Sequence, residues 1–378
     1  NAPIRQYGTI SDNYREIRLL AYFLQDFGAD LAVLPADIDP DFVKPGDTHT
    51  LRVSVRHDDT HGYVFVNNYQ RRLTMDDHKD VVLKGKTKGE PVRFPKTDIA
   101  SGEYAFYPYN MKIGNAILVS ALATPLCKLS CKDEDVYVFY GDKDPQFTWD
   151  GTPAKVLHLS REDALSAARV TLKDHQEYLV LSDDFVWEER GVLRVVGGEE
   201  TIIRTFPKLS KDVLPADFKE LASEGEFTVY KRSQNNANAQ TSVFFAQSAK
   251  TPEELSGKLV NSCGQPETLK GDEKIYDISV QYAKENREGR KEGYDCILSF
   301  DYACESMELY VNGRKVNDYF YTGQKALFSL GYFDFPTEIT AVLHPLHEGD
   351  HIYLQEWPKM DDKKACRIEA VTLTEQFS

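Results

Sequence analysis

The chain has 378 residues, of which 41% are hydrophobic, an ordinary value for a soluble globular protein with two or three domains. This composition excludes disordered and collagen-like chains. The formal net charge of −15 argues against binding to nucleic acid, which requires clustered Lys and Arg to neutralise phosphates. No apolar run reaches the length of a membrane span, and no signal-peptide pattern opens the chain. We therefore expect a cytoplasmic protein without a membrane partner.

The first predicted element is an amphipathic helix over residues 13–27. Ser11 is a suitable N-cap, and Gly28 occupies the position of a C-terminal glycine. Apolar residues recur at helical spacing: Tyr14, Ile17, Leu20, Leu24 and Phe27. The apolar surface is wide, because it also includes Ala21, Tyr22 and Phe23, and it must be buried against something. The candidates are the β-strands downstream and a structure outside this sequence.

The rest of the chain is dominated by strand patterns separated by turn residues, a spacing typical of β-sandwiches and barrels. The clearest predicted strands cover residues 51–56, 62–69, 136–140 and 201–205. Short helices are predicted at 161–168, capped by Ser160, and at 252–259, where Thr251 and Glu254 form a capping-box pattern. The predicted fold class is therefore mainly β, with one amphipathic helix at the N-terminus.

A domain boundary is predicted at the polar stretch 233–241, with the polar segment 247–274 as the alternative. Beyond it lies the clearest hairpin pattern, in which Asn312-Gly313 suits a type I′ turn. Later strands are predicted at 338–343, 351–357 and 365–373, and would complete a jelly-roll-like sandwich. The predicted domains are 1–28, 29–232 and 233–378.

Six cysteines in a chain of this length do not form a disulfide framework. Four of them lie in strand-like apolar contexts and are expected to be buried free thiols: Cys127, Cys296, Cys304 and Cys366. Cys127 and Cys131 have no matching second pair, so no zinc site is predicted. Free thiols fit a reducing compartment.

Motifs for catalysis, metals and cofactors are incomplete. Gly85-Lys86-Thr87 looks like the end of a phosphate-binding loop, but Asp80 occupies the position of the opening glycine. Two groups contain metal-ligand residue types without a metal-binding pattern: His57, Asp58, Asp59 and His61, and His344, His347 and His351. We interpret both as solvated turns. No metal and no cofactor is predicted.

Several segments along the chain resemble glycoside hydrolase family 35, the β-galactosidases. The opening PIRQYGTISDNYREIRLLAYFLQDFG (3–28) resembles the end of that family's catalytic (β/α)8 barrel. HDDTHGYVFVNNYQRRLTM (57–75) and YPYNMKIGNAILVSALATPLCKL (107–129) are similar to its β-domain. MELYVNGRKVNDYFYTGQKALFSL (307–330) and HPLHEGDHIYLQEWP (344–358) are similar to its C-terminal jelly roll.

The resemblance implies that residues 1–28 are the last helix of a barrel whose remainder is not in this sequence. Retaining glycosidases need two carboxylates about 5 Å apart. In the family both are glutamates on earlier barrel strands, one of them after an asparagine, and this chain contains no Asn-Glu dipeptide. No residue here is therefore predicted to be catalytic.

The resemblance instead implies an accessory region of a β-galactosidase-like enzyme, whose partners would be the catalytic barrel and galactose-containing glycans. Four residues are candidates for the substrate rim, because amides and a guanidinium can bond hydroxyls and an aromatic ring can stack on a sugar: Asn67, Asn68, Tyr69 and Arg71. The alternative is a free-standing carbohydrate-binding β-sandwich protein.

Overall fold

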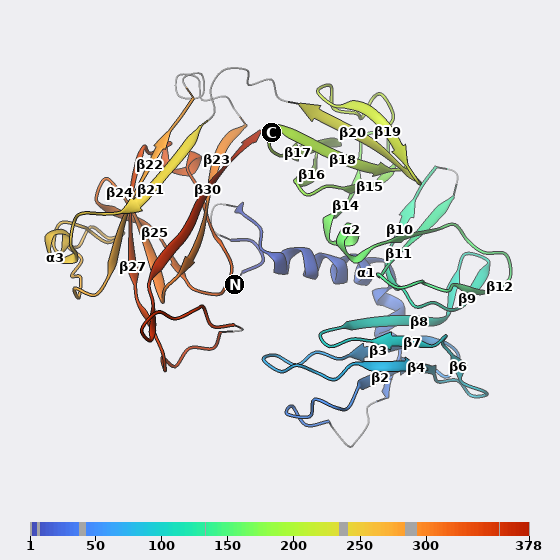
Figure 1. Cartoon of the computed structure of the whole chain (residues 1–378). Coiled ribbons are helices and arrows are strands. Elements are labelled where there is room, and N and C mark those ends of the chain that lie inside the picture. The colour runs from blue at the N-terminus through green and yellow to red at the C-terminus, as the bar shows by residue number, and fades with distance from the viewer. Residues whose placement is uncertain are drawn as a thin grey trace. The chain divides into compact units, whose positions relative to one another are not determined.

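The computed structural model describes residues 2–5, 8–37, 43–132, 134–233, 241–283, 293–354 and 356–377. The fold is mainly β, with 49% strand and 10% helix, as predicted (Figure 1). The chain divides into two compact units. The first contains Ile10–Val195 and Ile202–Arg232, and the second contains Ser233–Ser378 with Val196–Thr201.

The first unit combines the N-terminal helix α1 (Asp12–Val33) and the short helix α2 (Arg161–Ser166) with several sheets. A six-stranded sheet has the order β1 (Ala36–Asp37), β2 (Arg52–His57), β3 (Gly62–Asn67), β8 (Tyr104–Ile113), β9 (Ala116–Ser120) and β12 (Thr148–Asp150). A three-stranded sheet has the order β10 (Thr124–Ser130), β11 (Asp135–Tyr140) and β13 (Val156–Leu159).

The same unit contains most of a five-stranded sheet, in the order β14 (Ala167–Thr171), β15 (Glu177–Leu181), β18 (Glu200–Phe206), β20 (Phe227–Ser233) and β19 (Lys219–Glu224). Three two-stranded ribbons complete it: β4 (His78–Val81) with β7 (Thr97–Ile99), β5 (Lys84–Gly85) with β6 (Val92–Arg93), and β16 (Phe185–Glu189) with β17 (Val192–Val196). Strand β11 pairs with β13 in parallel, whereas it pairs with β10 in the antiparallel direction, as do β14 with β15, β2 with β3 and β3 with β8.

The second unit is a β-sandwich. One sheet has the order β21 (Ser242–Gln247), β22 (Lys274–Gln281), β27 (Glu338–His344), β24 (Ser306–Val311) and β25 (Arg314–Phe320). The other has the order β26 (Ala326–Ser329), β23 (Tyr294–Ala303) and β30 (Arg367–Phe377). Strands β28 (Leu346–His347) and β29 (Lys364–Ala365) form a ribbon, and α3 (Pro252–Leu255) and the 3-10 turn η2 (Gly331–Phe333) lie in connections. Inward side chains of both sheets form one core, among them Ile278, Leu298, Phe300, Leu309, Phe328 and Ala341.

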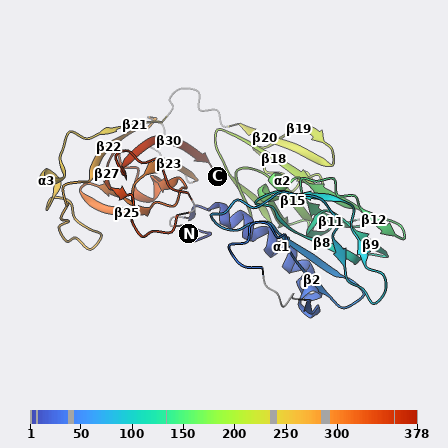
Figure 2. The same ribbon diagram turned by 60° about the horizontal axis from the view of Figure 1, so that its bottom comes forward.

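Helix α1 is longer than predicted (Figure 2). Ser11 is its N-cap residue, as predicted, but Gly28 lies inside the helix, which continues to Val33. The backbone leaves the helix at Leu34, next to Pro35, and Leu34 N–H donates to Leu31 O at 3.2 Å. A glycine is a permitted helix terminator and not an obligatory one, and packing of the following turn outweighs its propensity.

One face of α1 is buried in the core of the first unit. Leu19, Phe23 and Phe27 are buried, and the Phe23 ring lies 4.6 Å from Phe106 and 5.6 Å from Tyr63, centroid to centroid. The helix therefore belongs to the first unit and does not form a unit of its own. The downstream β-strands are thus its partner on this face.

The short predicted elements have mixed outcomes. The strands predicted at 51–56, 62–69, 136–140 and 201–205 correspond to β2, β3, β11 and β18. The Ser160 hydroxyl caps α2 by accepting from Asp163 N at 3.0 Å, and Thr251 with Glu254 forms the predicted capping box of the much shorter α3. The hairpin is confirmed, because Asn312 and Gly313 have φ values of 49° and 75° between β24 and β25.

The strand predicted at 351–357 is wrong: residues 351–354 and 356–357 have no strand structure, and Tyr353 is 81% exposed. Alternating apolar residues form a strand only where a neighbour offers backbone partners, and here Ile352 N–H donates locally to Asp350 O. The strand predicted at 365–373 is divided into β29 and the longer β30. Residues 234–240 of the predicted boundary lie outside the described residues.

Candidate functional site

A groove of about 730 Å³ lies between α1 and the sheet strands β2, β3 and β8. The α1 wall includes Ile17 and Leu20, and the sheet contributes Val53, Phe65 and Phe106. The Phe65 and Phe106 rings are stacked with centroids 5.5 Å apart. Few polar atoms face the groove along this stretch, so its central part is suited to an apolar occupant.

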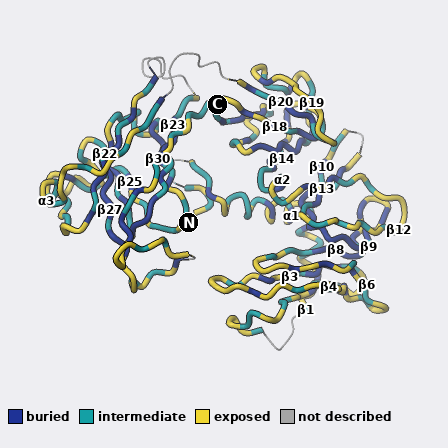
Figure 3. The backbone as a smooth tube through the Cα atoms, viewed as in Figure 1, coloured by how far each residue is buried: buried dark blue, intermediate teal, exposed yellow. Residues whose placement is uncertain are grey.

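The α1 wall of the groove includes Leu19 and Phe23 of the buried face and also Ile17 and Leu20, which belong to a second apolar face of the helix. Ile17, Leu20 and Leu24 follow each other at intervals of three and four residues, and they are 53%, 50% and 45% exposed. The face that carries Leu19, Phe23 and Phe27 is buried at the same time. Residues of different burial classes follow each other along α1 (Figure 3). The helix is therefore apolar on two faces, and the described structure covers one of them.

A polar network includes two residues of the groove lining, Glu16 and Tyr104. The Arg161 guanidinium donates from Nη2 to both Glu16 carboxylate oxygens at 2.7 Å and to the Tyr104 hydroxyl at 2.7 Å. It also lies 5.0 Å from the centroid of the Tyr104 ring. Burial opposes the charge of Arg161, but Tyr104 and Glu16 raise its pKa above the ordinary value. Burial raises the pKa of the neighbouring Tyr140 to about 12, so its hydroxyl stays protonated.

Arg52 supplies a different polar group to the groove. Its Nη2 donates to Lys44 O at 3.3 Å and to Asp47 O at 3.0 Å, whereas its Nη1 is buried and has no hydrogen-bond partner within the described chain. A buried donor without an acceptor is costly. An occupant that brings an acceptor to this position would remove the cost.

The four predicted rim residues do not form one site. Asn67 and Tyr69 line the groove, and the Asn67 side-chain oxygen accepts from Tyr69 N at 2.8 Å. Asn68 is fully buried, and its amide donates to Asp76 O and Ala100 O, each at 2.9 Å, so it braces a loop and is inaccessible to a ligand. Arg71 is exposed and lies outside the groove lining. The correction for Asn68 arises because adjacent strand-end residues point in opposite directions.

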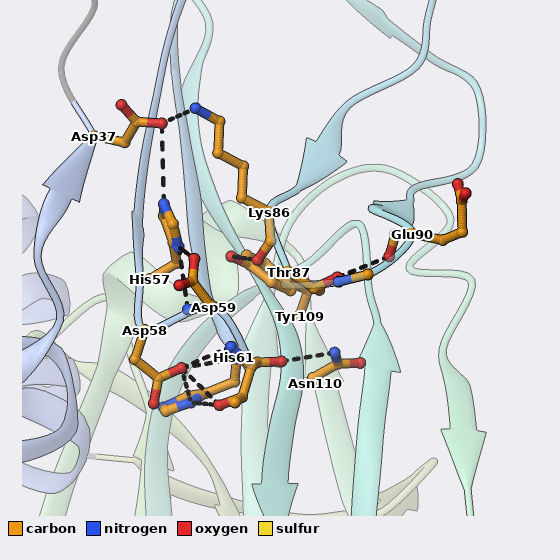
Figure 4. Close-up of polar contacts among 12 residues, drawn as sticks. Asp37, His57, Asp58, Asp59, His61, Lys86, Thr87, Glu90, Tyr109 and Asn110 are labelled. Atoms are coloured by element: carbon orange, nitrogen blue, oxygen red, sulfur yellow. Dashed lines mark hydrogen bonds and ion pairs between the residues drawn. The ribbon is translucent and has the colours of Figure 1, made fainter.

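The histidine and aspartate group at 57–61 connects β2 with β3, and Lys86 and Thr87 of the Gly-Lys-Thr segment lie near it (Figure 4). Asp37 pairs with Lys86 and lies 3.9 Å from His57 Nε2, while His57 Nδ1 lies 3.1 Å from Asp59. The Thr87 hydroxyl donates to Glu90 O at 2.8 Å, which closes a turn and leaves no phosphate cradle there. The polar side chains of this group therefore form hydrogen bonds and ion pairs with neighbouring residues of the chain.

No group of three or more His, Cys, Asp or Glu side chains in the described ranges is arranged to hold a metal ion. The second histidine group is dispersed among separate partners. His344 lies 3.6 Å from both Glu273 and Glu308, and His347 lies 3.8 Å from Asp350. Neither histidine group is a metal centre in this structure.

The six cysteines are free thiols, and the four predicted to be buried are buried. Desolvation raises the pKa of Cys127 and of Cys296 to about 12, so neither is a thiolate nucleophile near neutral pH. None of the described helices combines the length and the apolar character needed to cross a membrane.

Neither the protein-family models nor the curated proteins that were searched match this chain.

Proposed function

We propose that this chain is the accessory β region of a β-galactosidase-like glycoside hydrolase related to family 35, and that it supports a catalytic (β/α)8 barrel. The proposal rests on the sequence resemblance and on one structural observation, the uncovered apolar face of α1. A helix whose one face is buried in a β core and whose other face is apolar and exposed is typical of an interface element.

The groove beside α1 is the position where we place the barrel. Its apolar walls supply the buried area, and Arg52 Nη1 offers an unused donor to an acceptor from the barrel. Asn67 and Tyr69 lie on its margin, where an amide and an aromatic ring could extend the sugar-binding rim of the assembled enzyme.

The proposal also holds that the chain is not catalytic alone. Glycoside hydrolysis needs two carboxylates facing one bond. Among the described residues that line the groove, Glu16 is the one carboxylate, and both of its oxygens accept from Arg161. A carboxylate bound in this way is poorly suited to act as an acid or as a nucleophile.

The test uses the purified chain from a host without β-galactosidase activity, together with a separately produced family 35 catalytic barrel. We expect no turnover of a chromogenic β-galactoside by the chain alone and a one-to-one complex with the barrel by light scattering. Leu20→Glu should lower the affinity for the barrel at least about tenfold by placing a charge in the interface. Val192→Glu, on an exposed position of β17, is the matched control.

Turnover by the chain alone at a rate comparable with a complete β-galactosidase would contradict the proposal. Absence of any complex with the barrel would contradict it as well. A chain that binds sugar but no barrel would support the alternative, a free-standing carbohydrate-binding protein.

A further inference from the structure

A second pocket lies in the first unit, around a different part of α1. It has a volume of about 730 Å³ and is bounded by α1, the turn before β3, and strands β8, β9 and β12. None of its lining residues is shared with the groove beside Ile17 and Leu20. Its properties are therefore independent of the proposed barrel interface.

The pocket holds polar groups of both signs with unused hydrogen-bonding capacity. The side chains of Asp150 and Lys112 are exposed and make no hydrogen bond or ion pair with another described residue. Asp26 uses only Oδ2, which accepts from Lys128 N and from Arg169 Nη1, each at 2.7 Å. Asn110 donates from Nδ2 to Thr60 O at 2.8 Å and keeps its side-chain oxygen unused within the described chain.

The opposite wall of the pocket is held in place by hydrogen bonds. His61 lies between two carboxylates, with Nε2 at 2.9 Å from Asp30 and Nδ1 at 3.1 Å from Asp58. The Tyr63 hydroxyl donates to the other oxygen of Asp30 at 3.1 Å. His61 and Asn110 lie on neighbouring segments of this wall (Figure 4). A wall held in this way is ordered before a ligand arrives, which lowers the entropy cost of binding.

The chemistry of the lining selects a neutral ligand with many hydroxyl groups. A hydroxyl can donate to Asp150 and accept from Lys112, whereas an anion would meet the carboxylates of the pocket. Phe27, Met111 and Ile117 supply an apolar surface for C–H groups between these polar atoms. The volume lies within the range of about 300–1,000 Å³ that is usual for small-molecule sites.

We propose that this pocket, with Asp26, Asn110, Lys112 and Asp150 as its polar groups, binds a neutral hexose or disaccharide. The site goes beyond the proposed function, because it uses no residue of the barrel-docking groove. Sugar binding here and barrel binding there can therefore be tested, and can fail, separately.

The experiment is calorimetric titration of the purified full chain with lactose, and with galacturonate at the same concentrations. We expect saturable lactose binding with a Kd on the order of millimolar and weaker binding of galacturonate. The double variant Asp150→Asn with Lys112→Met should weaken lactose binding about tenfold or more, because it removes two charged hydrogen-bonding groups. Both positions are exposed, so the thermal midpoint should be unchanged.

Asp318→Asn is the matched control, since it makes the same change at an exposed strand position of β25 in the second unit. Lactose binding that is weakened by the double variant and unaffected by this control supports the site. The absence of saturable lactose binding overturns the proposal. Equal lactose affinity in the double variant and the parent chain, or an equal loss in Asp318→Asn, overturns it too.

Discussion

Arg169 is the residue that ties α1 most firmly to the β-strands. Its guanidinium donates to Asp26 on α1 and to Glu177 on β15, each at 2.7 Å, and its side chain is only 13% exposed. Its backbone N–H also donates to the Tyr22 hydroxyl at 2.9 Å. Burial opposes the charge, but the hydrogen bonds that Arg169 donates to both carboxylates raise its pKa above the ordinary value. The group thus stays charged and holds two elements together.

Arg169→Met should lower the free energy of unfolding by about 3 kcal/mol, because two carboxylates lose a mostly buried partner. Urea denaturation measures the change. The control is Arg194→Met, whose partner Glu189 is about as exposed as Arg194 itself, and which should cost less than about 1 kcal/mol. Equal costs for the two variants would show that Arg169 is not a structural tie.

A second charged network lies in the second unit, around Glu308 on β24. The Glu308 carboxylate accepts from the Tyr310 hydroxyl at 2.5 Å and from Lys315 at 2.9 Å, and it lies 3.6 Å from His344. Burial disfavours its charge, but the hydrogen bonds from His344, Tyr310 and Lys315 lower the pKa of Glu308 to about 2. The bond with Glu308 raises the pKa of His344 above its ordinary value.

These two pKa shifts predict that the free energy of unfolding is highest near pH 5–6 and decreases at both higher and lower pH. Because the pKa of His344 is raised, its contribution is complete below its ordinary pKa of 6.5 and is lost as the pH rises through the folded value. Because the pKa of Glu308 is lowered, its contribution is complete above 4.5 and is lost as the pH falls towards 2. Thermal midpoints measured across pH should show both limbs.

His344→Gln should remove most of the decrease in thermal midpoint at high pH. His347→Gln, at a more exposed position, should leave this decrease in place. If the thermal midpoint of His344→Gln still decreases at high pH, another group is responsible for the decrease.

At the scale of the element, α1 has one apolar face that is buried and one that is exposed. The periodicity predicted an apolar surface over Tyr14, Ile17, Leu20, Leu24 and Phe27, but the pattern alone did not indicate which apolar residues the β core would cover. Leu19 and Phe23, and not Leu20 and Leu24, are the buried ones. The choice depends on the rotation of the helix against the strands, which nonlocal packing sets.

Phe23→Ala should destabilise the chain by about 3–5 kcal/mol, since Phe23 is 1% exposed and contacts Phe106 and Tyr63. Leu24→Ala, one position further along on the exposed face, should cost less than about 1 kcal/mol. Urea denaturation of both variants gives the comparison. A similar loss for the two would contradict the assignment of the faces.

The hairpin β24–β25 and the segment 351–357 show why some elements are predictable and others are not. Asn312-Gly313 adopts a positive φ at both turn positions because these residues tolerate it, so the local sequence determines the hairpin. A segment in which apolar and polar residues alternate only favours a strand and does not determine one. Residues 351–354 and 356–357 do not pair with another strand, and they form no strand although some of their side chains are apolar.

At the scale of the whole molecule, each of the two units has its own core. The core of the second unit is a sandwich of two sheets, and the first unit gathers several clusters, one of which includes Leu19 and another Phe23 and Phe27. The mainly β class and the N-terminal helix followed from composition, periodicity and turn residues. The candidate site followed only in part, because Asn67 and Tyr69 line the groove, whereas Tyr104, which also lines it, and Arg161, which binds Tyr104, carry no local signal.

The sequence by itself determined the strand content, the helix at the N-terminus, the hairpin turn and the unpaired thiols, since these depend on residues that are close in the chain or on their chemical type. Only the tertiary structure decided which face of α1 is covered, that Asn68 is buried, and that Asp26, Asn110 and Asp150 surround one pocket. Burial and pocket lining depend on contacts between residues that can lie more than a hundred positions apart in the chain. No local sequence pattern encodes such contacts.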